Sequence, residues 1–501
     1  MSETYDYDLC VIGSGPAGQK CAVQAAKLGK RVCIIERKEV VGGVAINTGT
    51  IPSKALREAI LHLTGFGERS IFGASYQVKK DITIQDLSSW CQHIIRNEVD
   101  VVAAQLTRND VEIIHGEGAI DGPHRVRISH GSRDTEITAQ FIYIATGTRP
   151  ARPDNVAFDQ EHLVDADGML TMPRLPRTMI VVGGGVIGTE YASMMQALGV
   201  KVTLVEGRDG LLDFLDPEIQ EALQYHLRQH GMTLRMGEKV VKIEMIDAPP
   251  NARSSTGKLV EAMLESGKTL RAESLLYAIG RQGATRALNL ASVGIEADRR
   301  GRVRVNNRFQ VLAPANAGLT VGAGGPTHGA VPDADAPAAD GHIYAGGDVI
   351  GFPALASTAM EQGRLAACHM FGIGCQSFPE HFPFGIYAVP EISMVGWTEQ
   401  QLTEQDVPFE SGVARYREIA RGQLLGDEDG MLKLLVHPDT RLILGVHCIG
   451  NGATELIHIG QAVMLLKGTI DYFISTVFNY PTLAECYKVA ALNAVNKLAH
   501  M

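Results

Sequence analysis

A short apolar run, a glycine-rich turn and a helix-like stretch open the chain. Residues 7–12 read YDLCVI and predict a buried strand. Residues 13–18, GSGPAG, predict a tight turn. The pattern then fits a helix to about residue 28 and a second strand, RVCIIE, that ends at Glu36. A strand–turn–helix–strand unit of this kind is typical of a parallel α/β sheet.

The same pattern returns 170 residues later. TMIVV at 178–182 predicts a strand, GGGVIG at 183–188 predicts a turn, and the next helix runs to about residue 198. The strand VKVTLVE then ends at Glu206. The unit is therefore duplicated, with four marker positions at one offset: 13 and 183, 15 and 185, 18 and 188, 36 and 206.

Each marker has a physical role in holding a dinucleotide. The first glycine allows the tight turn, the second lets the backbone approach a pyrophosphate, and the third lets helix and strand pack closely. The helix N-terminus offers free N–H groups to the phosphates, and the acid accepts hydrogen bonds from a ribose 2′-hydroxyl. Both copies are complete and predict two dinucleotide sites, on Gly13, Gly15, Gly18 and Glu36 and on Gly183, Gly185, Gly188 and Glu206.

The second copy leaves the choice between NAD and NADP open. Glu206 favours the free 2′-hydroxyl of NAD and repels the extra phosphate of NADP. Arg208, two residues on, offsets this repulsion if it pairs with a 2′-phosphate. An ordinary solvated arginine is the alternative for Arg208.

Composition narrows the class of protein. A chain of 501 residues is long enough for several domains. Its formal charge of −10 disfavours a nucleic-acid partner, which requires a basic face. We see no run of about 18 uncharged apolar residues and no secretory signal, so we expect a cytoplasmic protein without a membrane span. The eight cysteines include no CxxC pair, and several lie in apolar runs, so we expect small buried hydrophobes rather than a zinc site or a disulfide framework.

Further landmarks identify a family resemblance. Gly42-Gly43 and the segment GTIPSKAL at 49–56 resemble the stretch after the second strand in two-dinucleotide-fold flavoprotein reductases, such as lipoamide dehydrogenase and glutathione reductase. Ala145-Thr146-Gly147 and Gly280-Arg281 resemble the turns that leave the two nucleotide domains of that family, and Gly347-Asp348 resembles its flavin-ribitol aspartate. The resemblance spans essentially the whole chain.

The resemblance implies a layout and a set of cofactor contacts. It implies an α/β fold with two Rossmann-like domains and an α+β C-terminal domain that forms a homodimer or a higher homo-oligomer. Residues 1–150 would be the first part of the FAD domain, 151–280 the NAD(P) domain, 281–380 the return to the FAD domain and 381–501 the dimerisation domain. It adds the cofactor-binding residues Gly43, Gly116, Thr146, Gly147, Asp348 and Gly280.

Two departures from the family pattern bear on the activity. The disulfide reductases carry two cysteines five positions apart in the segment where this chain has Ala45 and Thr50, so a thiolate cannot form at either position. Tyr480 replaces the family's C-terminal histidine, and a phenol with a pKa near 10 is a poor proton shuttle at neutral pH. FNYPT at 478–482 resembles the transhydrogenase group of this family, although members of that group commonly keep the first cysteine.

The transhydrogenase resemblance implies FAD-dependent hydride transfer between NADPH and NAD in a ping-pong cycle without a redox disulfide. Its candidate catalytic residues are Lys54 and Glu190, an ion pair beside the flavin in the family, with Tyr480 and Glu485 as further candidates at a dimer contact. Alternatives for these residues are solvated helix positions, a helix-dipole partner or plain packing. The alternative functions are an NAD(P)H oxidase or diaphorase, and a non-catalytic redox sensor that binds FAD and NAD.

One segment does not fit the pattern. Residues 311–341 are dominated by alanine, glycine and proline with almost no large apolar side chains. Such a composition cannot bury enough surface to order itself, which predicts a mobile surface loop between two strands of the FAD domain.

Overall fold

The computed structural model describes residues 4–251, 253–313, 341–375 and 377–498. The chain divides into two compact units, each built from three segments. Unit 1 comprises residues 1–55, 89–151 and 281–380, and unit 2 comprises residues 56–88, 152–280 and 381–501. The predicted loop at 311–341 falls almost entirely outside the described residues.

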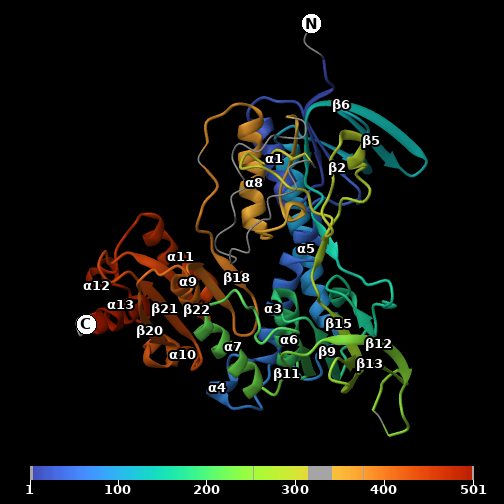
Figure 1. Cartoon of the computed structure of the whole chain (residues 1–501). Coiled ribbons are helices and arrows are strands. Elements are labelled where there is room, and N and C mark those ends of the chain that lie inside the picture. The colour runs from blue at the N-terminus through green and yellow to red at the C-terminus, as the bar shows by residue number, and fades with distance from the viewer. Residues whose placement is uncertain (1–3, 252, 314–340, 376, 499–501) are drawn as a thin grey trace. The chain divides into compact units, whose positions relative to one another are not determined.

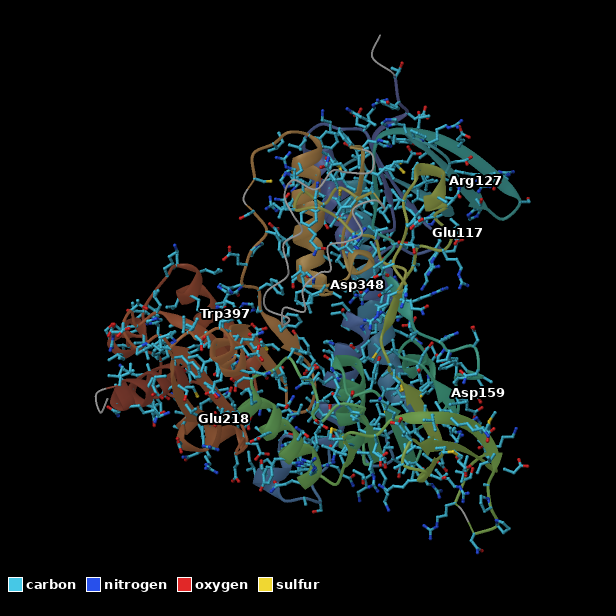
Figure 2. The ribbon with its side chains drawn as sticks, viewed as in Figure 1. Glu117, Arg127, Asp159, Glu218, Asp348 and Trp397 are labelled. Atoms are coloured by element: carbon cyan, nitrogen blue, oxygen red, sulfur yellow. The ribbon has the colours of Figure 1, made fainter. Side chains whose placement is uncertain are left out.

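Unit 1 is built on a seven-stranded sheet with the order β3-β2-β1-β6-β5-β4, in which β17 also pairs with β6 (Figure 1). The strands are β1 (Tyr7–Ile12), β2 (Val32–Glu36), β3 (Glu112–His115), β4 (Glu117–Ile120), β5 (Arg125–His130), β6 (Arg133–Ile144) and β17 (Ile343–Ala345). One end of β6 pairs in parallel with β1 and β17, while its other end forms an antiparallel ribbon with β5. On this ribbon exposed residues alternate with buried ones, and Figure 2 marks exposed Arg127 on β5 and exposed Glu117 on the neighbouring β4.

Helices α1 (Pro16–Lys27) and α8 (Ala356–Met370) lie side by side in unit 1 (Figure 1). The two helices can pack this closely because Gly363 has no side chain: a methyl group there would run into the Ala17 carbonyl oxygen. The other helices that lie wholly or partly in this unit are α2 (Gly43–Asn47), α3 (Thr50–Thr64) and α5 (Ile84–Thr107). A two-stranded ribbon pairs β7 (Thr148–Pro150) with β16 (Arg281–Gly283).

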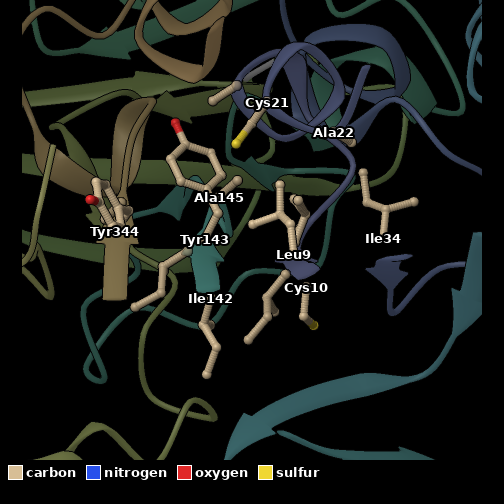
Figure 3. Close-up of a cluster of buried hydrophobic side chains, with 14 of the residues drawn as sticks. Leu9, Cys10, Cys21, Ala22, Ile34, Ile142, Tyr143, Ala145 and Tyr344 are labelled. Carbon is tan, nitrogen blue, oxygen red and sulfur yellow. The ribbon is translucent and has the colours of Figure 1, made fainter. Parts of the chain in front are cut away.

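The core of unit 1 lies between the parallel strands and α1. Leu9 and Cys10 on β1, Ile34 on β2 and Ile142 on β6 are fully buried, and Figure 3 shows them together. Cys21 on α1 is also fully buried and belongs to the same core. These cysteines behave as the small buried hydrophobes that the sequence predicts.

Unit 2 holds the second copy of the repeat. Its parallel sheet has the order β11-β10-β9-β15-β8. The strands are β8 (Leu163–Val164), β9 (Thr178–Val182), β10 (Lys201–Val205), β11 (Thr233–Arg235) and β15 (Ser274–Tyr277). Helices α6 (Val186–Ala197) and α7 (Pro217–Gln229) connect them, and an antiparallel sheet adds β12 (Val240–Asp247), β13 (Lys258–Leu264) and β14 (Thr269–Ala272).

The C-terminal part of unit 2 is a five-stranded antiparallel sheet with the order β18-β19-β22-β21-β20. The strands are β18 (Phe384–Ile386), β19 (Ile392–Gly396), β20 (Glu410–Arg415), β21 (Met431–Val436) and β22 (Ile443–Ile449). Helices α9 (Glu399–Glu404), α10 (Ala420–Leu425), α11 (Ala453–Leu465), α12 (Asp471–Ser475) and α13 (Glu485–Leu498) accompany them. The predicted strands and helices of both repeat copies are confirmed within one or two residues at their ends. Within the described ranges, no helix is both long and apolar enough to cross a membrane.

Candidate functional site

The first glycine turn follows β1 and begins α1. Gly13 has a φ of +107°, which favours glycine, and a methyl group there would run into the Ala145 carbonyl oxygen. A methyl group at Gly18 would overlap the Gly13 carbonyl oxygen. Both glycines are therefore required by the close approach of the protein's own backbone, whatever the turn binds.

Gly15 differs from these two glycines. Its backbone is extended, with φ −68° and ψ 179°, a conformation open to any residue. A Cβ atom at Gly15 would meet no protein atom within 4 Å, so nothing in the protein demands glycine there. The open space lies at the N-terminus of α1, where an anion is stabilised. Gly43 has a φ of +60°, and a Cβ there would lie 2.7 Å from the Gly15 Cα, so the segment after β2 packs directly on the turn.

Glu36 is fixed at the end of β2 by backbone donors. Its Oε2 accepts hydrogen bonds from the Ser14 N–H at 3.1 Å and the Ser14 hydroxyl at 2.6 Å, and its Oε1 accepts one from the Lys38 N–H at 3.0 Å. The Ser14 hydroxyl also accepts the Gly42 N–H at 2.9 Å. Ser14 thus ties the acid, the glycine turn and the paired glycines together.

Three further predicted residues lie at ends of strands in unit 1. Gly116, between β3 and β4, donates its N–H to the Glu36 carbonyl oxygen at 2.9 Å and has no room for a Cβ beside Ile128. Thr146 and Gly147 follow β6, and Gly147 has a φ of +64°. The Thr146 hydroxyl is buried without a hydrogen-bond partner among the described residues. A buried unpaired hydroxyl is costly, so Thr146 suits a polar ligand.

Asp348, labelled in Figure 2, is held by residues distant in sequence within unit 1. Its Oδ2 accepts the Thr148 hydroxyl at 3.1 Å, and Arg281 Nε donates to the Thr148 oxygen at 2.8 Å. The neighbouring Gly347 N–H donates to the Gln362 side chain on α8 at 2.7 Å. These contacts tie Asp348 to Thr148 and the neighbouring Gly347 to α8.

The second turn in unit 2 repeats the first. Gly183 has the same φ of +107°, and a methyl group there would crowd the Ala278 carbonyl oxygen, as at Gly13 and Ala145. A methyl group at Gly188 would overlap the Gly183 carbonyl oxygen. Gly185 is again extended, with φ −75° and ψ −175°, and faces open space.

Glu206 differs from Glu36 in its partners. The Gly184 N–H donates to Oε2 at 2.6 Å and the Arg208 N–H to Oε1 at 2.9 Å, in the positions of Ser14 and Lys38. The Arg208 guanidinium adds bonds of 3.0 Å to Oε1 and 3.2 Å to Oε2, and it reaches Asp213 at 2.6 Å. Burial opposes ionisation of Glu206, but the bonds from Arg208 and Gly184 outweigh it and lower the pKa of the carboxyl. Arg208 is about half exposed whereas Glu206 is buried, so the ion pair links a solvent-exposed guanidinium to a buried carboxylate.

The two candidate catalytic residues lie in different units. Lys54 is on α3 in unit 1, partly buried, with its ammonium 3.2 Å from the Ser53 hydroxyl. Glu190 is on α6 in unit 2, directly after the second turn, and is 4% exposed. Its Oε1 accepts the Tyr387 N–H at 2.8 Å.

The C-terminal candidates differ in exposure. Tyr480 is 74% exposed. Glu485 is the first residue of α13, and its Oε2 is buried without a hydrogen-bond partner in the part of the chain described here. Gly280, with a φ of +78°, ends the second nucleotide segment just before Arg281.

Unit 1 fits FAD. The open space at Gly15, the fixed Glu36, the unpaired Thr146 hydroxyl and the braced Asp348 are separate polar or unfilled features of one unit. The sequence assigned no supporting role to Ser14, Thr148 or Gln362, whose side chains hold these residues. Ser14 had a signal in the sequence, because it lies inside the glycine turn.

The fold and the two turns define a two-dinucleotide-fold flavoprotein. Residues 7–316 match the pyridine nucleotide-disulphide oxidoreductase family, and residues 382–491 match its dimerisation domain. The chain belongs to the pyridine nucleotide-disulphide oxidoreductase family. The predicted cofactors, FAD with NAD and NADP as substrates, are those of this family.

Similar proteins that align over nearly the whole chain share one name. The soluble pyridine nucleotide transhydrogenase of Mycobacterium tuberculosis is 51% identical over 98% of both chains. That of Colwellia psychrerythraea is 42% identical over 99% of this chain and all of the relative. Among solved structures, LpdA from Mycobacterium tuberculosis has a TM-score of 0.82 at 24% identity, covering 97% of this chain and 99% of LpdA. The HOCl-induced flavoprotein disulfide reductase RclA from Escherichia coli has a TM-score of 0.80 at 25% identity with the same coverage.

Proposed function

We propose that this protein transfers a hydride between NADPH and NAD by way of bound FAD, without a redox disulfide. The observation that carries the proposal is the combination of two complete dinucleotide turns with Ala45 and Thr50 at the positions of the redox cysteines. The shared name of relatives that align over nearly the whole chain supports it. FAD supplies a two-electron carrier that one nicotinamide dinucleotide reduces and another oxidises.

The protein's part in this reaction is binding and electrostatics. In the proposal the unit 1 turn and Glu36 hold FAD, which leaves the unit 2 turn for both nicotinamide dinucleotides. NADPH and NAD must then use Gly185 and the Glu206–Arg208 pair in alternation, which gives a ping-pong order. Lys54 and Glu190 provide opposite charges that orient the reacting groups, as the family resemblance implies.

An anaerobic assay tests the proposal. The purified protein is mixed with NADPH and a thio-analogue of NAD, and formation of the reduced analogue is followed by its absorbance. We expect turnover, with parallel lines in double-reciprocal plots because the order is ping-pong. Absence of turnover together with rapid oxygen consumption in air would instead favour an oxidase, and binding without either reaction a sensor.

A reductive titration tests the absence of a second redox centre. We expect uptake of two electrons per flavin, because neither Ala45 nor Thr50 carries sulfur. The double variant Ala45→Cys/Thr50→Cys is the control, since it restores both sulfur atoms and should accept up to four. Uptake of four electrons by the unaltered protein would contradict the proposal.

Arg208 is expected to let the same site accept NADP. It is half exposed and bound to Glu206, so it can leave the carboxylate and pair with a 2′-phosphate. Arg208→Ala should weaken NADP binding about tenfold to a hundredfold, since a hydrogen bond to a charged group is worth about 1.5–3 kcal/mol. NAD binding should be unchanged or tighter because Glu206 is freed. Dissociation constants from fluorescence titration measure both effects.

Asp213→Ala is the matched control for Arg208. It removes the guanidinium's other carboxylate partner and leaves the bonds to Glu206 in place. This variant should keep its affinity for NADP. An equal loss for both dinucleotides in Arg208→Ala would show that Arg208 does not discriminate between them.

We also propose a homodimer formed through residues 381–501. The match of residues 382–491 to a dimerisation domain supports it. Val477 is 90% exposed, Leu466 is 84% exposed and Tyr480 is 74% exposed, so large side chains of this region are accessible to a partner. A molar mass of one chain by light scattering would contradict this.

A further inference from the structure

A lysine is completely buried in the C-terminal sheet of unit 2. Lys433 lies in the middle of β21, and its side chain is 1% exposed. Its ammonium is 2.7 Å from Asp216 Oδ1, 2.8 Å from Glu399 Oε1 and 3.2 Å from Glu218 Oε2. Glu218, on α7, is marked in Figure 2.

Such burial is costly unless every charge is paired. Burial lowers the pKa of Lys433, but Asp216 and Glu399 outweigh this and raise it, so the ammonium stays charged. The Asp216 side chain is fully buried as well. The imidazole of His447 on β22 is also buried and interacts electrostatically with Asp216. Removing the lysine charge would leave Asp216 as an uncompensated carboxylate in the interior.

Asp216 is the junction between Lys433 and the nucleotide segment. It caps α7, because its Oδ1 accepts the Glu218 N–H at 3.2 Å. Its Oδ2 accepts the Glu399 N–H at 3.3 Å. One carboxylate therefore binds the start of α7, the start of α9 and the ammonium on β21.

The stretch from Glu206 to Asp216 is bound to the second turn at Glu206 and again at Leu212, and to Lys433 at its last residue, Asp216. At the turn, the Leu212 N–H donates to the Gly184 carbonyl oxygen at 3.2 Å, and Leu211 packs where a Gly184 side chain would lie. Gln220 on α7 donates to the Leu211 carbonyl oxygen at 2.6 Å. Lys433 holds the other end through Asp216. The same stretch carries Arg208 and Asp213, the residues around the ribose-reading Glu206.

We propose that Lys433 is a positioning residue for nicotinamide dinucleotide binding, which acts by fixing Asp216 and thereby the stretch 206–216. The inference rests on the proposed function of the second turn. Lys433 lies over 200 residues from that turn in sequence and belongs to the sheet matched by the dimerisation domain. The dimerisation domain thus helps to shape the nucleotide site of its own chain.

The variant Lys433→Met tests the proposal. Methionine keeps most of the volume and removes the charge, so Asp216 loses its main partner. If residues 206–216 keep their binding conformation in only a tenth of the variant molecules, the apparent dissociation constants of NAD and NADP both rise about tenfold. Equilibrium titration measures them, and hydrogen exchange should become faster in residues 207–216. Flavin content and the rate at saturating nucleotide should stay unchanged, so the effect falls on KM and not on kcat.

Two further variants make the test decisive. Lys497→Met removes another lysine that pairs with a carboxylate, Glu410 at 3.4 Å, in the same part of unit 2, and it should leave both dissociation constants unaltered. Asp216→Asn keeps the shape of the side chain and decides the question if Lys433→Met does not fold. This variant should weaken the binding of both NAD and NADP. Lower thermal stability with unchanged nucleotide affinity would overturn the positioning role. Absence of nucleotide binding in the unaltered protein would instead overturn the proposed function.

Discussion

Replacing Gly15 with alanine is expected to give a folded protein that is purified without flavin colour. The backbone at Gly15 is extended and a Cβ there would touch no protein atom, so the substitution strains nothing in the protein itself. If a pyrophosphate occupies that space, the new methyl group keeps it from the turn. Loss of two charge-assisted hydrogen bonds, at about 1.5–3 kcal/mol each, lowers FAD affinity by at least about a hundredfold.

The repeat supplies a matched control for Gly15. Gly185→Ala makes the same change at the corresponding position of the second copy, again without a steric clash within the protein. It should keep flavin and lose affinity for NAD and NADP. Flavin content by absorbance, nucleotide affinity by titration and folding by circular dichroism separate the two variants. Full flavin content in Gly15→Ala would show that the first turn does not hold the pyrophosphate.

Gly18→Ala contrasts with these variants. Its methyl group would overlap the Gly13 carbonyl oxygen, so the protein's own packing fails before any ligand is bound. The three glycines of one motif therefore divide into two required by the fold and one left to the ligand. The sequence shows all three as equal, and only the backbone geometry separates them.

The repeat could be predicted from the sequence because its residues interact within one short segment. The conformation of Gly13, the approach of Gly18 and the acid at Glu36 all belong to one strand–turn–helix–strand unit, in which spacing along the chain determines distance in space. The boundaries of β1, α1, β9 and α6 accordingly agree with the sequence prediction. The hydrogen bonds to Glu36 and Glu206 also repeat at the same offset.

Side-chain partners that lie far apart along the chain could not be predicted in this way. Asp348 was predicted, but its support from Thr148 joins positions 200 residues apart. Lys433 stands in the apolar run MLKLLV, where a sequence gives no reason to expect a lysine in the interior. Its partner Asp216 is 217 residues away and looks like an ordinary helix cap. Side-chain pairs of this kind depend on tertiary packing, which periodicity and motif spacing do not encode.

Glu190→Gln is expected to slow hydride transfer about a hundredfold while the protein keeps its fold and its flavin. The resemblance assigns Glu190 as the counter-charge of Lys54, and loss of a preorganised charge beside reacting atoms costs about 10²–10³ in rate. Glutamine keeps an oxygen that can still accept the Tyr387 N–H, so the local structure is preserved. Stopped-flow mixing with NADPH, followed by bleaching of the flavin absorbance, measures the rate.

The competing explanation is that Glu190 only clamps residues 387–389 onto α6. Ser193, one turn later on α6, makes an equivalent bond, because its hydroxyl accepts the Val389 N–H at 3.0 Å. Ser193→Ala removes that bond outright and leaves the Glu190 charge in place. If Glu190 serves hydride transfer through its charge, Glu190→Gln is slow and Ser193→Ala is nearly as fast as the unaltered protein. If both residues are only clamps, Ser193→Ala is the more damaged of the two, and the assignment of Glu190 to the reaction fails.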